Sequence, residues 1–194
     1  DIVGQEKFMD FAIMNSFLSH REFPAPDPWF AGSGMPYYHA GYLMHAVVAK
    51  LSGVPGPIAY NLSVVSVFAL GFTAAYSLAS NLVRKIVGAS ALSASFTGLI
   101  AGLFVMVIGN LEALFELLSI RNFGNAELWT TLGIKGLKMG QPSAGWLPAE
   151  GGWWWRASRI IPTTQPDGIN EFPYFSFLLG DLHPHFMAVP LDLL

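Results

Sequence analysis

The chain has no cysteine and few charged residues. Without cysteine it has no disulfide bond and no thiolate ligand for a metal ion. Only 12% of its 194 residues are charged, whereas a soluble globular domain has about 25%. Basic segments with interleaved aromatic residues are also missing, so nothing in the sequence indicates a nucleic-acid partner. The low charge, together with 53% hydrophobic residues, excludes an ordinary soluble domain.

The missing charges are concentrated in two long stretches. No charged residue occurs between Lys50 and Arg84, and none occurs between Lys85 and Glu112. Each stretch is longer than the roughly 20 residues that cross a hydrocarbon core of about 30 Å. We therefore expect an integral membrane protein with one transmembrane helix in each stretch, over residues 58–83 and 94–111.

The segments before residue 52 are too polar or too short for an ordinary transmembrane helix. Residues 5–20 have apolar positions at helical spacing and several charges, which predicts an amphipathic helix lying at the membrane surface. Residues 21–38 are rich in proline and glycine and are predicted to form a loop. Residues 36–51 then form a helix of only about 24 Å, which is either a short or tilted span or a partly inserted helix.

These segments predict an all-α fold: a polytopic transmembrane helical bundle with an interfacial helix and long external loops. Arg84 and Lys85 favour a cytoplasmic turn between two crossings, which leaves the loops outside the cell membrane. The chain begins without Met and stops inside an apolar segment, so we expect an excerpt of a longer multi-pass protein. We divide this single membrane domain into a helix and loop (1–39), transmembrane helices (40–118), a Trp/Arg-rich loop (119–175) and the start of a further transmembrane helix (176–194).

The segment "GDLHPH" places an aspartate and two histidines beside an apolar run. Asp181 is a candidate N-cap of the next helix, with Pro184 in the first turn, where proline costs no hydrogen bond. That interpretation leaves the histidines unexplained, because imidazoles are poorly suited to unpaired burial in lipid. In the alternative interpretation, Asp181, His183 and His185 bind a divalent metal ion.

Glu6 and Asp10 lie one turn apart on the first predicted helix. They either form a solvated polar face, or supply a carboxylate that activates an acceptor or holds a metal ion at the membrane surface.

The segment "WWWRASR" also has two interpretations. Its tryptophans and arginines fit a membrane–water interface, with the arginines reaching the lipid headgroups. Alternatively, Arg156 and Arg159 beside Trp154 bind the phosphate of a lipid-linked substrate. The aromatic helix start at Tyr37, Tyr38 and His39 can line the same cavity.

Four motifs occur in order along the chain: "EKFMDFAIMNSFL", "FPAPDPWFAGSGMPYYHAGYLMHAVVAKLSG", "WWWRASRIIP" and "INEFPYFSFLLGDLHPH". Together they resemble the YYY family of uncharacterised polytopic membrane proteins, named for a run of tyrosines. The third tyrosine of that run is replaced here by His39. The YYY family is in turn similar to the C superfamily of glycosyltransferases (GT-C), which take their sugars from polyprenyl-phosphate donors.

The resemblance implies a membrane-embedded glycosyltransferase that works at the external face with a lipid-linked sugar donor and membrane lipids as partners. Enzymes of this type place an acidic residue early in the first external loop, and here that position falls on Asp10, with Glu6 as the alternate. Arg156 and Arg159 would neutralise the leaving polyprenyl phosphate, and a divalent metal ion is the expected cofactor. A transporter and a non-catalytic membrane subunit remain alternatives at this stage.

Overall fold

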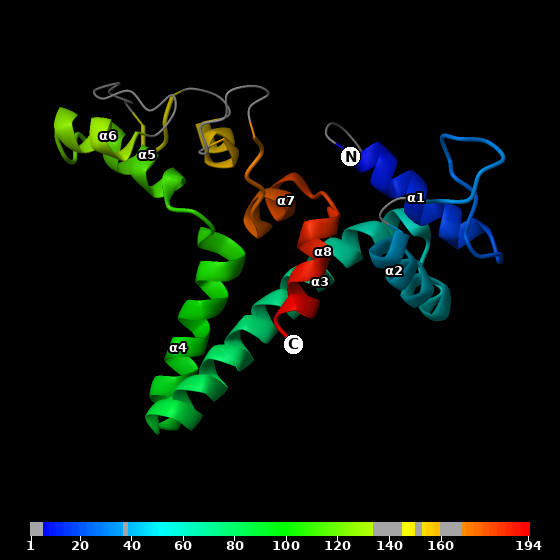
Figure 1. Cartoon of the computed structure of the whole chain (residues 1–194), viewed down its shortest axis with the longest axis horizontal. Helices are drawn as coiled ribbons and strands as arrows, with labels where there is room; N and C mark the ends of the chain where they lie inside the picture. Colours follow the sequence, from blue (N-terminus) through cyan, green and yellow to red (C-terminus); the bar gives the residue numbers. More distant parts are fainter. Residues whose placement is uncertain (1–5, 37–38, 134–144, 150–152, 160–167) are drawn as a thin grey trace. The chain divides into compact units, whose positions relative to one another are not determined.

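The computed structural model describes all residues except 1–5, 37–38, 134–144, 150–152 and 160–167 (Figure 1). The described residues are mainly helical and contain no β-strand; their one bridge pairs Pro26 with Gly34 inside the proline-rich loop. The all-α prediction is confirmed. The chain divides into two compact units, and we describe each by itself: residues 1–107 with 173–194, and residues 108–172.

The first unit contains the predicted helices in the predicted order. Its elements are α1 (Lys7–Ser19), α2 (His39–Ser52), α3 (Gly56–Leu82), a π-helical turn (Val83–Val87), α4 (Ala91–Leu103), α7 (Pro173–Leu179) and α8 (Pro184–Asp192). α4 continues as a second π-helical turn (Phe104–Ile108). Pro184 is the first residue of α8 and Pro57 the second residue of α3, positions where a missing N–H leaves no carbonyl unpaired.

Two helices of the described chain are long and apolar enough to cross a membrane: Gly56–Val87 and Ala91–Ile108. Only 28% and 22% of their apolar windows are buried within the protein, whereas the core helix of a soluble protein is mostly buried. Large apolar side chains point outward along both helices, among them Leu62, Val65, Leu70, Phe96, Leu99 and Leu103. These surfaces suit contact with lipid.

α3 and α4 form an antiparallel hairpin with closely approaching backbones (Figure 1). The buried residues of α4 are Ala94, Gly98 and Gly102, a small residue at every fourth position. A Cβ atom at Gly98 would lie 2.7 Å from the carbonyl oxygen of Tyr76. Small residues at this spacing allow membrane helices to pack by van der Waals contact, because lipid supplies no hydrophobic drive between them.

The largest apolar core of this unit lies where α1, α2 and α8 meet the first turns of α3. Met14, Tyr42 and Phe186 are fully buried there. α2 and α8 approach closely at Gly41, since a Cβ at that position would lie 2.6 Å from the Met187 side chain. This packing holds α1 and the α7–α8 loop against the same end of α3.

The second unit contains α5 (Glu112–Ile120), α6 (Ala126–Leu132) and a 3₁₀ helix (Trp153–Ser158). The Trp/Arg-rich loop expected over 119–175 therefore contains short helices of its own, α6 and the 3₁₀ helix. Asn125 caps α6 by accepting a hydrogen bond from Leu128 N at 2.9 Å. Asn110 Nδ2 donates to the Ala157 carbonyl at 2.6 Å and ties the start of α5 to the 3₁₀ helix.

We predict that Gly98→Leu destabilises the α3–α4 hairpin, because the new side chain meets backbone that cannot move aside. Overpacking of this kind costs about 1–3 kcal/mol, and the melting temperature in detergent should fall accordingly. The control is Leu99→Phe, which enlarges a side chain on the exposed face of the same helix. Equal melting temperatures for Gly98→Leu and the wild type would contradict the close packing.

Candidate functional site

Asp10, Asp181 and His183 come together in the first unit. One ligating atom from each of them lies within 4.8 Å of the others. Asp10 belongs to α1, whereas the other two belong to the loop between α7 and α8, near the opposite end of the chain. The fold therefore builds a cluster of two carboxyls and an imidazole from residues remote in sequence.

Asp10 is fully buried on the inner face of α1. It shares that face with Ile13, Met14 and Phe17, at the spacing of one helical stripe. Tyr42 Oη donates a hydrogen bond of 2.5 Å to Asp10 Oδ1. The solvated-face interpretation is therefore wrong for Asp10, because its position in the stripe points it into the core.

Glu6 differs from Asp10, although the two were grouped on one face. It precedes the first turn of α1, and its side chain is 52% exposed. Glu6 Oε2 lies 3.6 Å from His183 Nδ1, so this exposed carboxylate stands at the rim of the cluster.

The two aspartates differ in pKa. Burial, followed by the neighbouring Asp181 carboxyl, raises the pKa of Asp10 to about 8, against the opposing hydrogen bond from Tyr42. Burial alone would raise the pKa of Asp181, but the neighbouring His183 and Asp10 side chains, with the positive charges of His183 and Lys7, together lower it. Near neutral pH the pair therefore holds one proton, on Asp10, while Asp181 is ionised.

Asp181 is not the N-cap of α8, contrary to the sequence-based prediction. His183 occupies the N-cap position with extended backbone, and Pro184 begins the helix as expected. A turn at Gly180, with φ of +65°, redirects the chain after α7. The Leu182 N–H then donates to Tyr60 Oη at 3.1 Å. The loop is thus fastened to α3, and the Asp181 carboxyl turns toward α1 rather than toward the end of α8.

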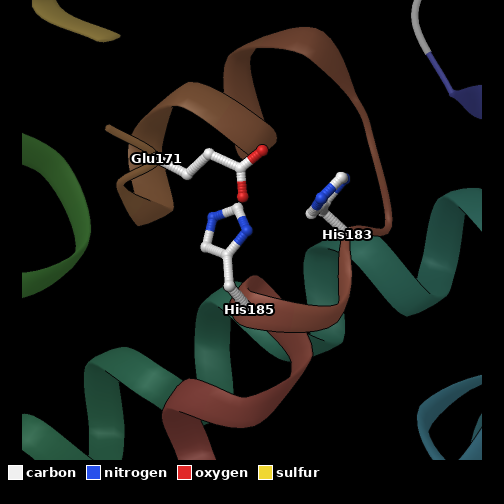
Figure 2. Close-up of side chains that lie close together, drawn as sticks. All are labelled: Glu171, His183 and His185. Atoms are coloured by element: carbon white, nitrogen blue, oxygen red, sulfur yellow. The ribbon is translucent and has the colours of Figure 1, made fainter. Parts of the chain in front are cut away.

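The two histidines begin α8 and have different neighbours. Figure 2 shows both imidazoles at this end of the helix, and their ring centroids are 5.0 Å apart. His183 Nδ1 lies 3.6 Å from Asp181 Oδ2, whereas His185 Nε2 lies 3.2 Å from Ser176 Oγ on α7. Within this unit the structure joins Asp181 and His183 with Asp10 rather than with His185.

His39 lies at the start of α2, beside a mainly apolar groove between α2 and α8. The groove has a volume of about 390 Å³, and its lining includes Pro36, His39, Met44, Pro184, Met187 and Leu191. Because Pro184 follows His183 directly, the groove begins next to the cluster. The other two members of the aromatic run, Tyr37 and Tyr38, lie outside the described residues.

The arginines of the Trp/Arg-rich segment belong to the second unit. Arg156 Nε donates to Glu116 Oε1 in a salt bridge with a nearly buried glutamate. Arg159 Nη1 donates to the Ser158 carbonyl and hydroxyl, and the Arg159 guanidinium lies 4.9 Å from the centre of the Trp155 ring. The Trp154 ring stands edge-on to Trp155 at 5.8 Å. Arg156 is therefore already paired with a carboxylate.

Sequence reasoning missed Glu112 and Glu116. Both are buried, and both oxygens of Glu112 have no hydrogen-bond partner among the described residues. Their spacing in the sequence could have revealed them, because the two acids lie one turn apart on the same face of the otherwise apolar helix "EALFELLSI". Burial, followed by the neighbouring Glu116 carboxyl and its charge, raises the pKa of Glu112 to about 8.

Comparison with known protein families decides where the chain belongs. A family described as uncharacterized membrane proteins, DUF2298, matches residues 1–194. The chain belongs to the DUF2298 family. No curated protein and no solved structure matches it. Membership of DUF2298 agrees with the two apolar helices and with the expected kind of family, a set of uncharacterised membrane proteins.

The cluster in this DUF2298 protein has the groups needed for proton transfer. A carboxyl whose pKa lies near the working pH can accept and return a proton, and buried carboxyl pairs with separated pKa values are typical of acid–base sites. Two carboxylates and an imidazole also form a donor set for a divalent metal ion. Both properties, proton transfer and metal binding, come from residues outside the two apolar spans.

We predict that Glu112→Gln changes the pH dependence of stability in the second unit. The pKa of Glu112 is raised from 4.5 to about 8 on folding, so its contribution to stability is complete below the lower value and is lost as the pH rises to the upper one. The melting temperature of the wild type should fall between about pH 5 and about pH 9, by a few degrees more than that of the variant.

The matched control for this measurement is Glu127→Gln, an exposed glutamate on α6. This control should follow the wild-type curve. Identical curves for Glu112→Gln and the wild type would show that Glu112 does not hold its proton in the folded protein.

Proposed function

We propose that this chain carries the reaction centre of a membrane-embedded glycosyltransferase, which transfers sugar from a polyprenyl-phosphate donor at the external membrane face. The observation that carries the proposal is the buried Asp10 carboxyl, held by Tyr42 and facing Asp181 and His183. Burying carboxyls is costly, and an arrangement that tunes a pKa toward neutrality is characteristic of reaction centres.

The cluster lies beside the beginning of α3, and this position supports chemistry at the membrane surface. The Tyr60 hydroxyl, which holds the 181–183 loop, lies near the beginning of α3, while Arg84 and Lys85 lie at its other end. About 36 Å of helix separate these two ends at about 1.5 Å per residue, more than a hydrocarbon core of about 30 Å. Basic residues favour the cytoplasmic side, so the cluster belongs at the external side.

The proposed reaction is a substitution at the anomeric carbon of the sugar. The acceptor's nucleophilic atom forms a bond to this carbon, and the bond from the carbon to the phosphate oxygen breaks. The electron pair leaves with the polyprenyl phosphate. In its ionised form, which a pKa of about 8 leaves to a minority of molecules near neutral pH, Asp10 accepts the proton of the acceptor. Glu6 at the rim is the alternate base, and His183 orients the carboxyl pair.

Two arginines of the second unit, Arg156 and Arg159, remain proposed phosphate ligands, and their contacts within that unit alone distinguish them. Arg156 is neutralised by Glu116, whereas Arg159 hydrogen-bonds only neutral serine oxygens among its described contacts. Arg159 is therefore the better phosphate ligand of the two. Trp154 and the aromatic run Tyr37, Tyr38 and His39 remain proposed substrate contacts.

Chemistry on a lipid-linked substrate fits this chain better than transport. Transport pathways are marked by ionisable residues inside the spans. The stretches 56–82 and 91–108 have no Asp, Glu, Lys, Arg or His, and the acidic residues lie outside them.

The test is a transfer assay on the purified protein in lipid, with labelled polyprenyl-phosphate sugars as donors. The wild type should transfer sugar, and Asp10→Asn should lower turnover by about 100-fold or more, because it removes the base. His183→Ala should also lower turnover. Asp192→Asn, an exposed aspartate of α8, is the matched control and should retain wild-type turnover.

Melting temperatures separate loss of chemistry from loss of fold in these variants. Equal turnover by Asp10→Asn and the wild type would refute the role of Asp10. Failure of the wild-type protein to transfer sugar from any donor would overturn the proposed function.

A further inference from the structure

The cluster of Asp10, Asp181 and His183 has a feature that proton transfer leaves unexplained. One oxygen of each carboxyl, Asp10 Oδ2 and Asp181 Oδ1, is buried and has no hydrogen-bond partner among the described residues. Asp10 is 0% exposed and Asp181 is 4% exposed. Buried polar atoms in folded proteins are almost always satisfied, so two such oxygens within one cluster point to a bound group.

Hydrogen bonds around the two carboxyls hold them in place without using Asp10 Oδ2 or Asp181 Oδ1. Tyr42 Oη donates to Asp10 Oδ1 and orients the carboxyl without using Oδ2. The bond from Leu182 N to Tyr60 Oη holds the backbone between Asp181 and His183. In metal sites, such outer contacts fix the ligands and are almost as important as the ligands themselves.

We propose that Asp10, Asp181 and His183 bind one divalent transition-metal ion, with water completing its coordination. The three ligating atoms already lie within 4.8 Å of one another. An ion with bonds of about 2.1 Å brings its ligand atoms to about 3–4 Å apart, so side-chain rotation alone closes the site.

The donor set selects the class of ion. Two carboxylates and one imidazole suit Mn²⁺ or Zn²⁺, whereas Mg²⁺ and Ca²⁺ prefer oxygen ligands throughout. The charge also fits, because a doubly positive ion neutralises two buried carboxylates. Glu6, exposed at the rim and 3.6 Å from His183, adds further negative charge beside the cluster.

This assignment differs from the triad Asp181, His183 and His185 that the "DLHPH" spacing suggested. His185 is hydrogen-bonded to Ser176 on α7, and its place is taken by Asp10 from α1. The metal site does not depend on the transfer reaction. If Asp10 is bound to the ion, the acceptor proton passes to Glu6, the alternate base.

The experiment measures metal binding directly. The full protein is stripped with a chelator and titrated calorimetrically with Mn²⁺ and with Zn²⁺, and bound metal is counted by mass spectrometry. The wild type should bind one ion per chain. Asp10→Asn and His183→Ala should weaken binding at least about 100-fold, and Tyr42→Phe, which keeps the ligands, about 10-fold.

The controls are Asp192→Asn and His20→Ala, both at exposed positions, together with His185→Ala. All three should bind like the wild type. Absence of binding by the wild type, or unchanged affinity in Asp10→Asn, would overturn the site. Loss of binding in His185→Ala without loss in Asp10→Asn would replace it with the triad suggested by spacing.

Metal binding and sugar transfer can fail independently. Binding in a protein that transfers no sugar leaves the metal site standing and removes the proposed function. Transfer that continues unchanged in chelator, by a protein with no bound metal, does the reverse.

Discussion

The burial of one carboxyl group organises the first unit of this protein. Asp10 lies on the inner stripe of α1, and a buried carboxyl requires partners. Tyr42 on α2 supplies a hydrogen bond, and the α7–α8 loop brings Asp181 and His183 against it. Three features bring these groups together: the helix packing, the turn at Gly180, and the hydrogen bond from Leu182 N to Tyr60 Oη. Each is needed because the residues come from opposite ends of the chain.

The apolar membrane spans and the buried acidic residues occupy different segments of the chain. The α3–α4 hairpin contains no Asp, Glu, Lys, Arg or His within residues 56–82 and 91–108 and packs through the small residues Ala94, Gly98 and Gly102. The buried acids lie outside those spans, on α1, in the α7–α8 loop and on α5. Such a division is expected in lipid, where a charge is costly and a close backbone contact is not.

Much of the fold was predictable from the sequence. The absence of charge located both spans, and proline and glycine located the loop after α1. The site was only partly predictable. Asp10, Asp181 and His183 are all candidates in the sequence. The local pattern leaves Asp10 between a solvated face and a catalytic carboxylate, and Asp181 between a helix cap and a metal triad with His183 and His185. Glu112 and Glu116 were missed, because acids at this spacing are usually solvated.

The sequence by itself determined the environment of each segment, because hydropathy and charge act over a few neighbouring residues. Those properties already indicate a helical membrane protein, and membership of the DUF2298 family agrees with it. Only the tertiary structure decided which polar groups meet. Whether Asp10 faces solvent or Asp181 depends on how α1 packs against α2, α3 and the loop before α8. That choice is made by contacts between residues far apart in the chain, which no local pattern records.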